Sequence, residues 1–210
     1  MSISTPERLA PPTIGPADQT FRDSAEDSLE PRRFPGWRWV AVALAFPVAG
    51  YIGWGIGGHV NAVDAALIGG AVTGAGLGAV EWWAAKGELG RPATWIGASA
   101  VGYSVGLAVG AALVGYDTDL GSLAAMGAVS GAVLGGAQGL VLAREGRREL
   151  ALPWAVAMPV LFGLGWCAST GIGVDVGKQW TVFGAAGAVL FMLLSGLVLA
   201  RFAPSRRQVA

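Results

Sequence analysis

Six weakly charged stretches, each of about 20 residues, constrain this chain more than any other feature of its sequence. A helix of that length crosses about 30 Å of hydrocarbon, so each stretch predicts one transmembrane helix. The predicted spans are residues 37–57, 64–84, 94–115, 120–143, 152–171 and 180–202. The sequence therefore predicts an all-α membrane protein with six transmembrane helices.

Composition supports this class and excludes others. Hydrophobic residues make up 53% of the chain, charged residues 13%, and the mean hydropathy is +0.55, which lies outside the range of soluble domains. A formal net charge of zero gives no basic face for nucleic acid. Cys167 stands alone, so neither a disulfide framework nor a cysteine zinc site is available. We expect the lipid bilayer as surroundings, with no nucleic-acid partner, no metal and no cofactor.

The two ends of the chain and its basic residues predict an orientation. Residues 1–36 are polar and rich in proline and predict a disordered tail, and residues 203–210 form a second, short tail. Basic residues are retained on the cytoplasmic side of a membrane. Those near the predicted spans lie on one side: Arg32, Arg33, Arg38, Lys86, Arg91, Arg144, Arg147, Arg148, Arg201, Arg206 and Arg207. Only Lys178 lies on the other side, so we expect both tails in the cytoplasm.

A repeat with a period of about 57 residues organises the spans into three tandem hairpins, 37–84, 94–143 and 152–202. The even spans carry glycines four residues apart, which let helix backbones approach closely in lipid. These packing glycines are Gly70, Gly74 and Gly78 in one copy and Gly127, Gly131 and Gly135 in the next. The repeat admits an arrangement of the hairpins about a pseudo-threefold axis.

The odd spans share a second pattern. Each has a tryptophan near its cytoplasmic end and a glycine 11 residues later, about three helical turns away on the same face. The tryptophans are Trp39, Trp95 and Trp154, and the glycines are Gly50, Gly106 and Gly165. Because amphipathic rings prefer headgroup depth, the tryptophans are expected to anchor the spans at the membrane interface.

Glu81, Gln138 and Ser195 occupy one position of the repeat and form a candidate polar column about 9 Å inside the membrane. An intramembrane carboxylate in such a ring could hold a proton or a cation. The alternative is a set of hydrogen bonds between helices. We prefer hydrogen bonding, because the column is not uniformly acidic and Glu81 is followed by the interfacial pair Trp82 and Trp83.

Acidic residues and the lone His59 mark the external connections. Asp64, Asp117, Asp119 and Asp175 could form an acidic mouth for cations, or could cap the following helices, as Asp64 suggests; we prefer capping. His59 could ligate a metal or a pigment magnesium, but without a second candidate ligand it is better read as a loop residue. A catalytic set is not recognised, since Ser130 is expected near mid-membrane and His59 at the surface.

The segment G-x3-G-x3-G-x2-Q followed by an apolar LVL-R ending resembles a loose class of bacterial polytopic membrane proteins built from repeated glycine-zipper hairpins. Residues 138–144 match that ending, and residues 81–87 and 195–201 match it in part. The resemblance implies the bacterial cytoplasmic (inner) membrane and brings no activity with it.

Two functions are compatible with these patterns. We expect a non-enzymatic scaffold or accessory subunit of a membrane assembly, which packs against other subunits or against itself through its glycine faces. The alternative is a channel or transporter for a small solute or cation that uses Glu81 and Gln138. An intramembrane enzyme and a pigment-binding subunit stay open as lesser alternatives.

Overall fold

The computed structural model describes residues 36–85 and 87–202. The two predicted tails lie outside the described residues, apart from Gly36. Within the described ranges the chain is helical, without strands, and six helices are long and apolar enough to cross a membrane. The prediction of an all-α chain with six helices long and apolar enough to span a membrane is therefore confirmed for the described residues.

The first span is built from three pieces, α2 (Gly36–Ala41), the 3-10 turn η1 (Val42–Leu44) and α3 (Ala45–Gly57). Pro47 accounts for the irregular turn, because it has no N–H to give to the carbonyl of Ala43 four residues earlier. The other spans are α4 (Val63–Ala85), α5 (Pro92–Leu113), α6 (Leu120–Arg144), α7 (Arg148–Gly171) and α8 (Ala185–Phe202). A second short turn, η2 (Val176–Lys178), precedes α8.

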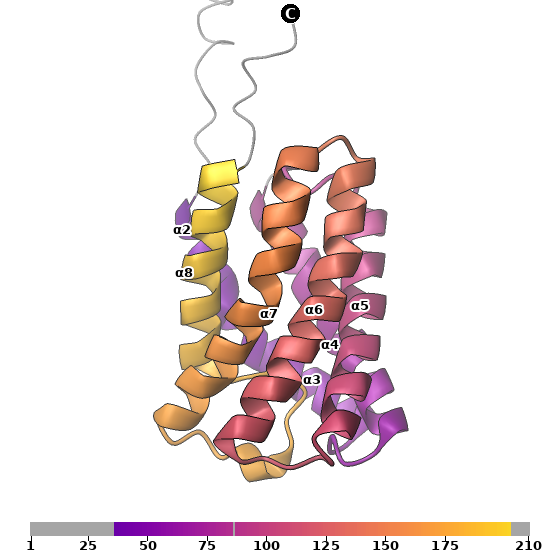
Figure 1. Cartoon of the computed structure of the whole chain (residues 1–210), viewed down its shortest axis with the longest axis vertical. Coiled ribbons are helices and arrows are strands. Elements are labelled where there is room, and N and C mark those ends of the chain that lie inside the picture. Colours follow the sequence, from indigo (N-terminus) through magenta and orange to yellow (C-terminus); the bar gives the residue numbers. More distant parts are fainter. Residues whose placement is uncertain (1–35, 86, 203–210) are drawn as a thin grey trace, which may run out of the picture. The chain divides into compact units, whose positions relative to one another are not determined.

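Helices that follow one another in the sequence pack side by side (Figure 1). Short loops make neighbouring helices antiparallel, as expected for helical hairpins. The last helix, α8, also contacts α2, η1 and α3, so the six spans close into a ring. We call the end with Arg38, Arg91, Arg147 and Arg201 the basic end, and the other end the opposite end.

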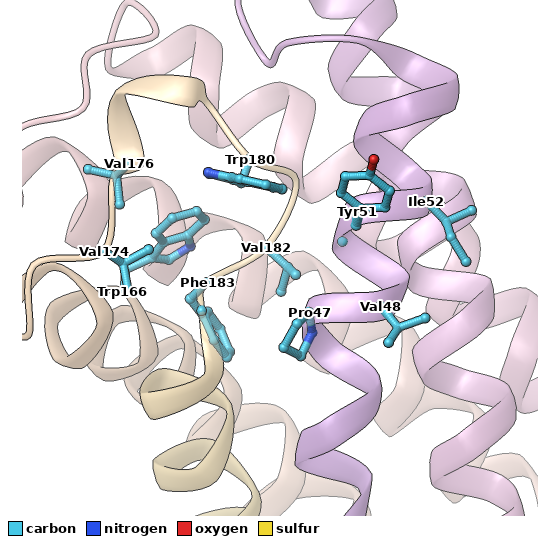
Figure 2. A pocket seen from close by; sticks show the side chains of 12 residues that line it. Pro47, Val48, Tyr51, Ile52, Trp166, Val174, Val176, Trp180, Val182 and Phe183 are labelled. Carbon is cyan, nitrogen blue, oxygen red and sulfur yellow. The ribbon is translucent and has the colours of Figure 1, made fainter.

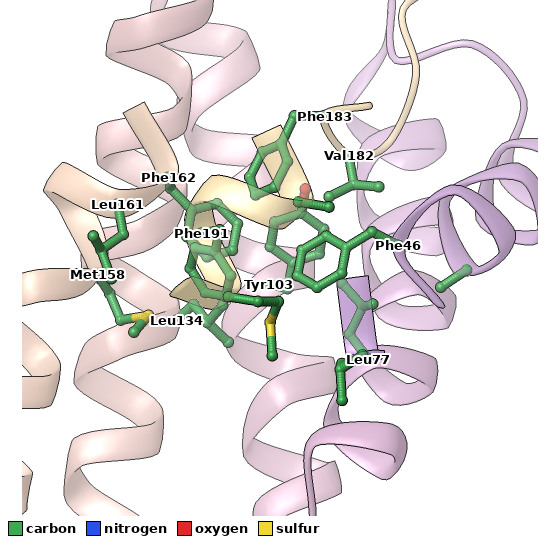
Figure 3. Close-up of a cluster of buried hydrophobic side chains, with 14 of the residues drawn as sticks. Phe46, Leu77, Tyr103, Leu134, Met158, Leu161, Phe162, Val182, Phe183 and Phe191 are labelled. Atoms are coloured by element: carbon green, nitrogen blue, oxygen red, sulfur yellow. The ribbon is translucent and has the colours of Figure 1, made fainter. Parts of the chain in front are cut away.

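Aromatic side chains fill the centre of this ring (Figure 3). The rings of Phe162 and Phe191 have centroids 5.1 Å apart, and Phe183 lies 5.4 Å from both Phe162 and Phe46. Tyr103 of α5 packs on Phe162 at 5.6 Å. These side chains are fully buried, so the core consists of packed side chains at this level.

The segment before α8 enters the bundle as non-helical chain. The sequence predicts a helix from residue 180, but α8 begins at Ala185, and Thr181, Val182 and Phe183 are buried. Irregular backbone inside a membrane protein needs internal hydrogen-bond partners. Thr181 provides them: its hydroxyl donates to the carbonyl of Gly50 at 2.9 Å, and its own carbonyl accepts from the hydroxyl of Tyr103. The predicted start of the sixth helix is therefore wrong by five residues.

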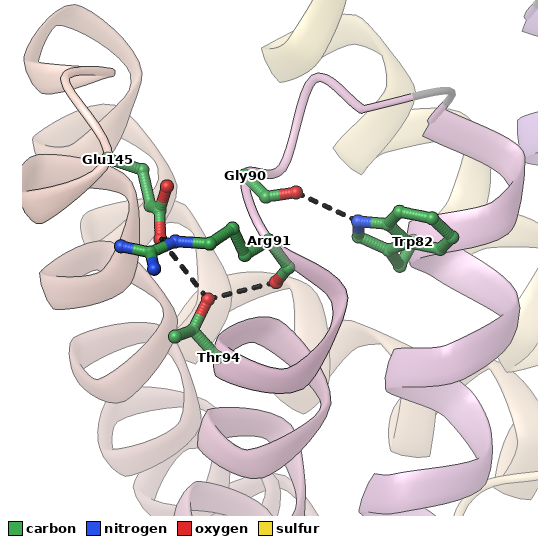
Figure 4. Close-up of polar contacts among 5 residues, drawn as sticks. All are labelled: Trp82, Gly90, Arg91, Thr94 and Glu145. Carbon is green, nitrogen blue, oxygen red and sulfur yellow. Dashed lines mark hydrogen bonds and ion pairs between the residues drawn. The ribbon is translucent and has the colours of Figure 1, made fainter.

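Two ion pairs tie the α4–α5 loop to the α6–α7 turn at the basic end. Arg147 Nη1 donates to Glu88 at 2.7 Å, and both side chains are about four-fifths buried. Arg91 Nε donates to Glu145 at 3.0 Å, with the arginine largely exposed (Figure 4). These pairs hold neighbouring hairpins together where the chain leaves the helices.

Candidate functional site

The three residues of the predicted polar column, Glu81, Gln138 and Ser195, lie on α4, α6 and α8 and are all buried. Glu81 and Gln138 lie together, with Nε2 of Gln138 3.5 Å from Oε2 of Glu81. Within the described part of the chain, the hydrogen bonds of Ser195 go to Trp39 and Met192 and not to Glu81 or Gln138. The structure thus brings two of the three residues into contact.

Each column residue accepts a hydrogen bond from a tryptophan of an odd-numbered span. The indole Nε1 atoms donate from Trp95 to Oε2 of Glu81 at 3.3 Å, from Trp154 to Oε1 of Gln138 at 2.8 Å, and from Trp39 to Oγ of Ser195 at 3.0 Å. The rings also touch one another edge-on, with Trp154 5.8 Å from Trp95 and 6.2 Å from Trp39. The column and the tryptophans therefore form one buried polar and aromatic network.

This network corrects the expectation that Trp39, Trp95 and Trp154 anchor the spans at the membrane interface. Each of the three side chains is 0% exposed, so none faces a lipid headgroup. The physical reason is the indole N–H, which needs an acceptor wherever it lies. The column supplies those acceptors inside the bundle, and the large rings then fill its interior.

Gln138 has the most connections in the network. Its carbonyl oxygen accepts from Trp154, and its Nε2 donates to Oγ of Ser99 at 2.9 Å as well as approaching Glu81. Ser99 in turn donates to the carbonyl of Trp95 one turn earlier. Ser99 was not singled out from the sequence, although a serine inside an apolar span is a signal that could have identified it.

The hydrogen-bond partners of Glu81 are neutral side chains. Its carboxylate accepts from Trp95 and Gln138, and in the described part of the chain no arginine, lysine or histidine is paired with it. Neither the pocket beside α3 and residues 174–184 (Figure 2) nor the small pocket beside Tyr116 and Leu123 is lined by the column. What the arrangement does chemically is to satisfy buried donors and acceptors between helices.

The packing glycines of the even spans face neighbouring helices of the same chain. A Cβ added at Gly74 would lie 2.4 Å from the carbonyl oxygen of Ser99 on α5, and one at Gly131 would lie 2.4 Å from that of Met158 on α7. A Cβ added at any of the other glycines of both sets would also lie within 3 Å of an atom of the neighbouring helix; these are Gly70, Gly78, Gly127 and Gly135. These two faces are therefore used within the chain and are not available to a partner.

The glycines of the odd spans also mark close approaches. A Cβ at Gly106 would lie 2.8 Å from the carbonyl oxygen of Ser130 on α6. At Gly165 and Gly50 it would meet Phe183 at 2.8 Å and Val182 at 2.6 Å, both in the segment that enters the bundle. These last two contacts break the pattern of helix against helix, because α8 begins only at Ala185.

Among the acidic residues of the opposite end, Asp119 caps a helix and Asp64 does not. Asp119 caps α6, with Oδ1 accepting from the backbone N–H of Gly121 at 2.9 Å and of Ser122 at 3.1 Å. Hydrogen bonds from Ser122, through its hydroxyl and its N–H, hold the pKa of Asp119 below its ordinary value. The expectation that Asp64 caps its helix is wrong, since α4 begins at Val63 and Asp64 lies within the first turn.

His59 is exposed and its Nδ1 lies 2.8 Å from the carbonyl oxygen of Lys178. Its ring stands edge-on against Trp54 at 5.5 Å. Among the described residues no group of three histidine, cysteine, aspartate or glutamate side chains could hold a metal. The histidine thus joins the α3–α4 loop to the segment before α8.

A second buried hydrogen-bond cluster surrounds Thr181 and was not predicted. Thr73 of α4 donates to Oγ1 of Thr181 at 2.9 Å, and Thr181 connects onward to Gly50 and Tyr103. The one signal in the sequence is a polar residue, Thr181, at the start of a predicted span.

Comparison with protein-family models, with curated proteins and with solved structures gives no match to this chain. The functional argument therefore rests on the geometry of the molecule itself.

Proposed function

We propose that the chain is a non-enzymatic scaffold or accessory subunit of a membrane assembly. One observation carries the proposal. After its inner glycines have packed on α7, α6 keeps a second face of small residues four apart, Ala128, Ala132 and Gly136. Ala132 and Gly136 are exposed, and a Cβ at Gly136 would meet nothing within 4 Å. Such faces let a further helix approach closely in lipid.

The filled interior supports a role exerted through the outer surface. Phe162, Phe183 and Phe191 occupy the middle of the ring, and the tryptophan network occupies the part toward the basic end. Because the centre is packed in this way, a partner would bind to the lipid-facing helix surfaces or to the loops.

The pairing of tryptophans with column residues supports a pseudo-threefold arrangement of three hairpins with a period of about 57 residues. Each tryptophan reaches the column residue of the preceding hairpin, and the first hairpin's Trp39 reaches Ser195 of the last. Glu81 and Gln138, which are in contact, are separated by 57 positions. We further propose that the basic end lies in the cytoplasm of a bacterial inner membrane.

The partner to test first is a second copy, because a small-residue face can pack against itself about a twofold axis. The full chain is extracted in polymer-bounded lipid particles, and its oligomeric state is measured by native mass spectrometry. We expect oligomers that Gly136→Leu weakens about tenfold. Gly55→Leu is the matched control: Gly55 is also exposed and unhindered, but Tyr51 stands four residues before it.

A lone monomer that carries no further membrane subunit in these particles would contradict the scaffold proposal. Equal oligomerisation of the Gly136→Leu and Gly55→Leu variants would show that α6 is not the face used. A defined second subunit that Gly136→Leu releases would support the accessory role.

The second candidate is a proton or cation pathway, because Glu81 is a carboxylate buried within the membrane-spanning helix α4. Purified protein in liposomes with a pH-sensitive dye tests it. Flux that falls at least tenfold in Glu81→Gln, a change that keeps the shape of the side chain, would support conduction. Absence of flux, or flux unchanged by the substitution, excludes it.

A further inference from the structure

The basic end carries more positive charge than its acidic side chains neutralise. Two of its arginines, Arg147 and Arg91, form ion pairs with Glu88 and Glu145. Within residues 36–85 and 87–202, the other arginines of this end form no ion pair with a carboxylate; they are Arg38, Arg144, Arg148 and Arg201. This end is therefore a positive surface that attracts anionic groups.

Arg38 differs from the other unpaired arginines because a second helix holds it in place. Its Nη2 donates to the carbonyl oxygen of Trp83 on α4 at 3.3 Å, and its Cζ lies 4.1 Å from the centroid of the Trp83 ring. Such stacking of a guanidinium on an indole is a cation–π contact. A guanidinium has five N–H donors, and this hydrogen bond uses one of them. Arg38 is thus a fixed, half-buried cation with donors left for an oxygen ligand.

Two exposed tryptophans flank this cation. Trp37 on α2 is 75% exposed and Trp83 on α4 is 56% exposed. Neither indole N–H has an acceptor in the described part of the chain, whereas Trp82 donates to the carbonyl of Gly90 at 2.8 Å (Figure 4). An indole with an exposed ring and a free N–H is typical of the layer between hydrocarbon and water. The surface around Arg38 therefore suits the headgroup region of a lipid.

The position of these residues along the helices gives the same depth. Arg38 lies two residues after the start of α2 at Gly36, and Trp83 lies two residues before the end of α4 at Ala85. Each is about 3 Å along the axis from its helix end, within the interfacial layer of about 5 to 7 Å. Leu44, seven residues or about two turns after Trp37, is 77% exposed and continues an apolar surface toward the membrane centre.

The chemistry of Arg38 indicates which part of a lipid it meets. Guanidinium groups bind phosphate oxygens through charge-assisted hydrogen bonds, and phospholipid phosphates lie in the interfacial layer. A surface with unneutralised positive charge favours lipids with a net negative charge over zwitterionic ones.

We propose that Arg38 binds the phosphate of an anionic phospholipid at the edge between α2 and α4, in the leaflet at the basic end. Trp83 is a positioning residue, because its ring and its carbonyl orient the guanidinium. The proposal does not depend on the scaffold role, since α2 and α4 form this site and the exposed small-residue face belongs to α6.

The experiment measures lipid binding to the delipidated full chain in native mass spectrometry. The probes are palmitoyl-oleoyl phosphatidylglycerol and the phosphatidylcholine with the same acyl chains. We expect one phosphatidylglycerol to bind more tightly than phosphatidylcholine, and Arg38→Gln to raise its dissociation constant about fivefold. Arg144→Gln is the matched control: it removes the same charge from an exposed arginine of the basic end that has no ion pair among the described residues, and it should change the constant less than twofold.

An equal rise for Arg38→Gln and Arg144→Gln would mean diffuse attraction to the basic end and would overturn the assigned site. Equal affinity of the parent protein for the two lipids would overturn the preference for an anionic headgroup. Displacement of the bound lipid by inorganic phosphate at the same molar concentration would mean a site for a soluble anion, which also overturns the proposal.

Variants of Trp83 test the positioning without a change of charge. Trp83→Leu removes the ring beneath Arg38 and should weaken phosphatidylglycerol about threefold, whereas Trp83→Phe keeps a ring and should restore most of the affinity. A purely structural role, in which Arg38 caps the last carbonyls of α4, predicts a lower unfolding midpoint for Arg38→Gln and Trp83→Leu with unchanged lipid affinity. That result would overturn the proposal.

Oligomeric state in the same spectra separates this site from the proposed scaffold role. Weaker phosphatidylglycerol binding with an unchanged oligomer in Arg38→Gln supports the lipid site alone. Dissociation of an oligomer by Arg38→Gln, with lipid affinity retained, would mean that Arg38 contacts a protein partner and would overturn the proposal.

Discussion

The amide oxygen of Gln138 accepts a 2.8 Å hydrogen bond from the indole Nε1 of Trp154, across the contact between α6 and α7. The amide nitrogen donates to Oγ of Ser99 on α5 at 2.9 Å. One neutral side chain thus connects three helices.

Replacement of Gln138 by leucine should destabilise the protein by about 1–2 kcal/mol, because it leaves the N–H of Trp154 buried without an acceptor. Unfolding in mixed micelles with increasing SDS measures the change. Ser195→Ala, which removes a single acceptor, should cost less. A larger loss for Ser195→Ala than for Gln138→Leu would contradict the central place of Gln138.

Alanine at Gly131 should destabilise the contact of α6 with α7 by about 1–3 kcal/mol. The added Cβ would lie 2.4 Å from the carbonyl oxygen of Met158 and 2.9 Å from Cα of Pro159, both backbone atoms that cannot rotate away. Gly136→Ala is the control on the same helix, since nothing lies within 4 Å of its Cβ. Thermal unfolding in detergent compares them, and equal midpoints would refute the close approach.

Tyr103→Phe should loosen the segment before α8, because it removes the hydroxyl that donates to the carbonyl of Thr181. A hydrogen bond in a membrane protein contributes on average about 0.6 kcal/mol, so amide exchange at residues 179–184 should become about threefold faster. Hydrogen–deuterium exchange with mass spectrometry measures this. Tyr51→Phe is the control, because Tyr51 is exposed on α3; equal protection in both variants would count against the prediction.

The cap of α6 should make stability fall in acid. The pKa of Asp119 is lowered in the folded state, so its contribution is fully present above the unfolded value of about 3.9. The contribution is lost as the pH falls through the lower, folded value. Asp119→Ala should therefore unfold at lower temperature at neutral pH and lose less on acidification than the parent protein. Asp117→Ala, two residues earlier, should keep the parent's acid response, and a parallel response of all three proteins would refute the assignment.

The two ion pairs of the basic end should differ in importance. Arg147→Gln breaks a pair that is mostly buried and also loses a 3.2 Å bond to the carbonyl of Gly87, so we expect about 1–2 kcal/mol of destabilisation. Arg91→Gln removes an arginine that is 79% exposed, where the expected effect is at most about 1 kcal/mol. SDS unfolding of both variants at low and high salt tests this order, and a greater loss for Arg91→Gln would reverse it.

Local patterns predicted the spans well, because a helix in lipid must satisfy its own backbone and needs a fixed apolar length. They also identified Glu81 and Gln138 as buried polar positions. The prediction failed for Trp39, Trp95 and Trp154, because a tryptophan near the end of a span can lie either at the membrane interface or inside the bundle. Only the neighbouring helices decide which way the ring faces.

By itself, the sequence determined that this chain forms six helices long and apolar enough to span a membrane, and which positions along them are small or polar. Both properties follow from the spacing of residues along one helix. The tertiary structure decided which faces meet, where α8 begins and which indole N–H groups find acceptors. Those outcomes depend on groups from distant parts of the chain, such as Thr181 with Gly50 or Trp39 with Ser195, whose contacts exist only once the ring of helices has closed.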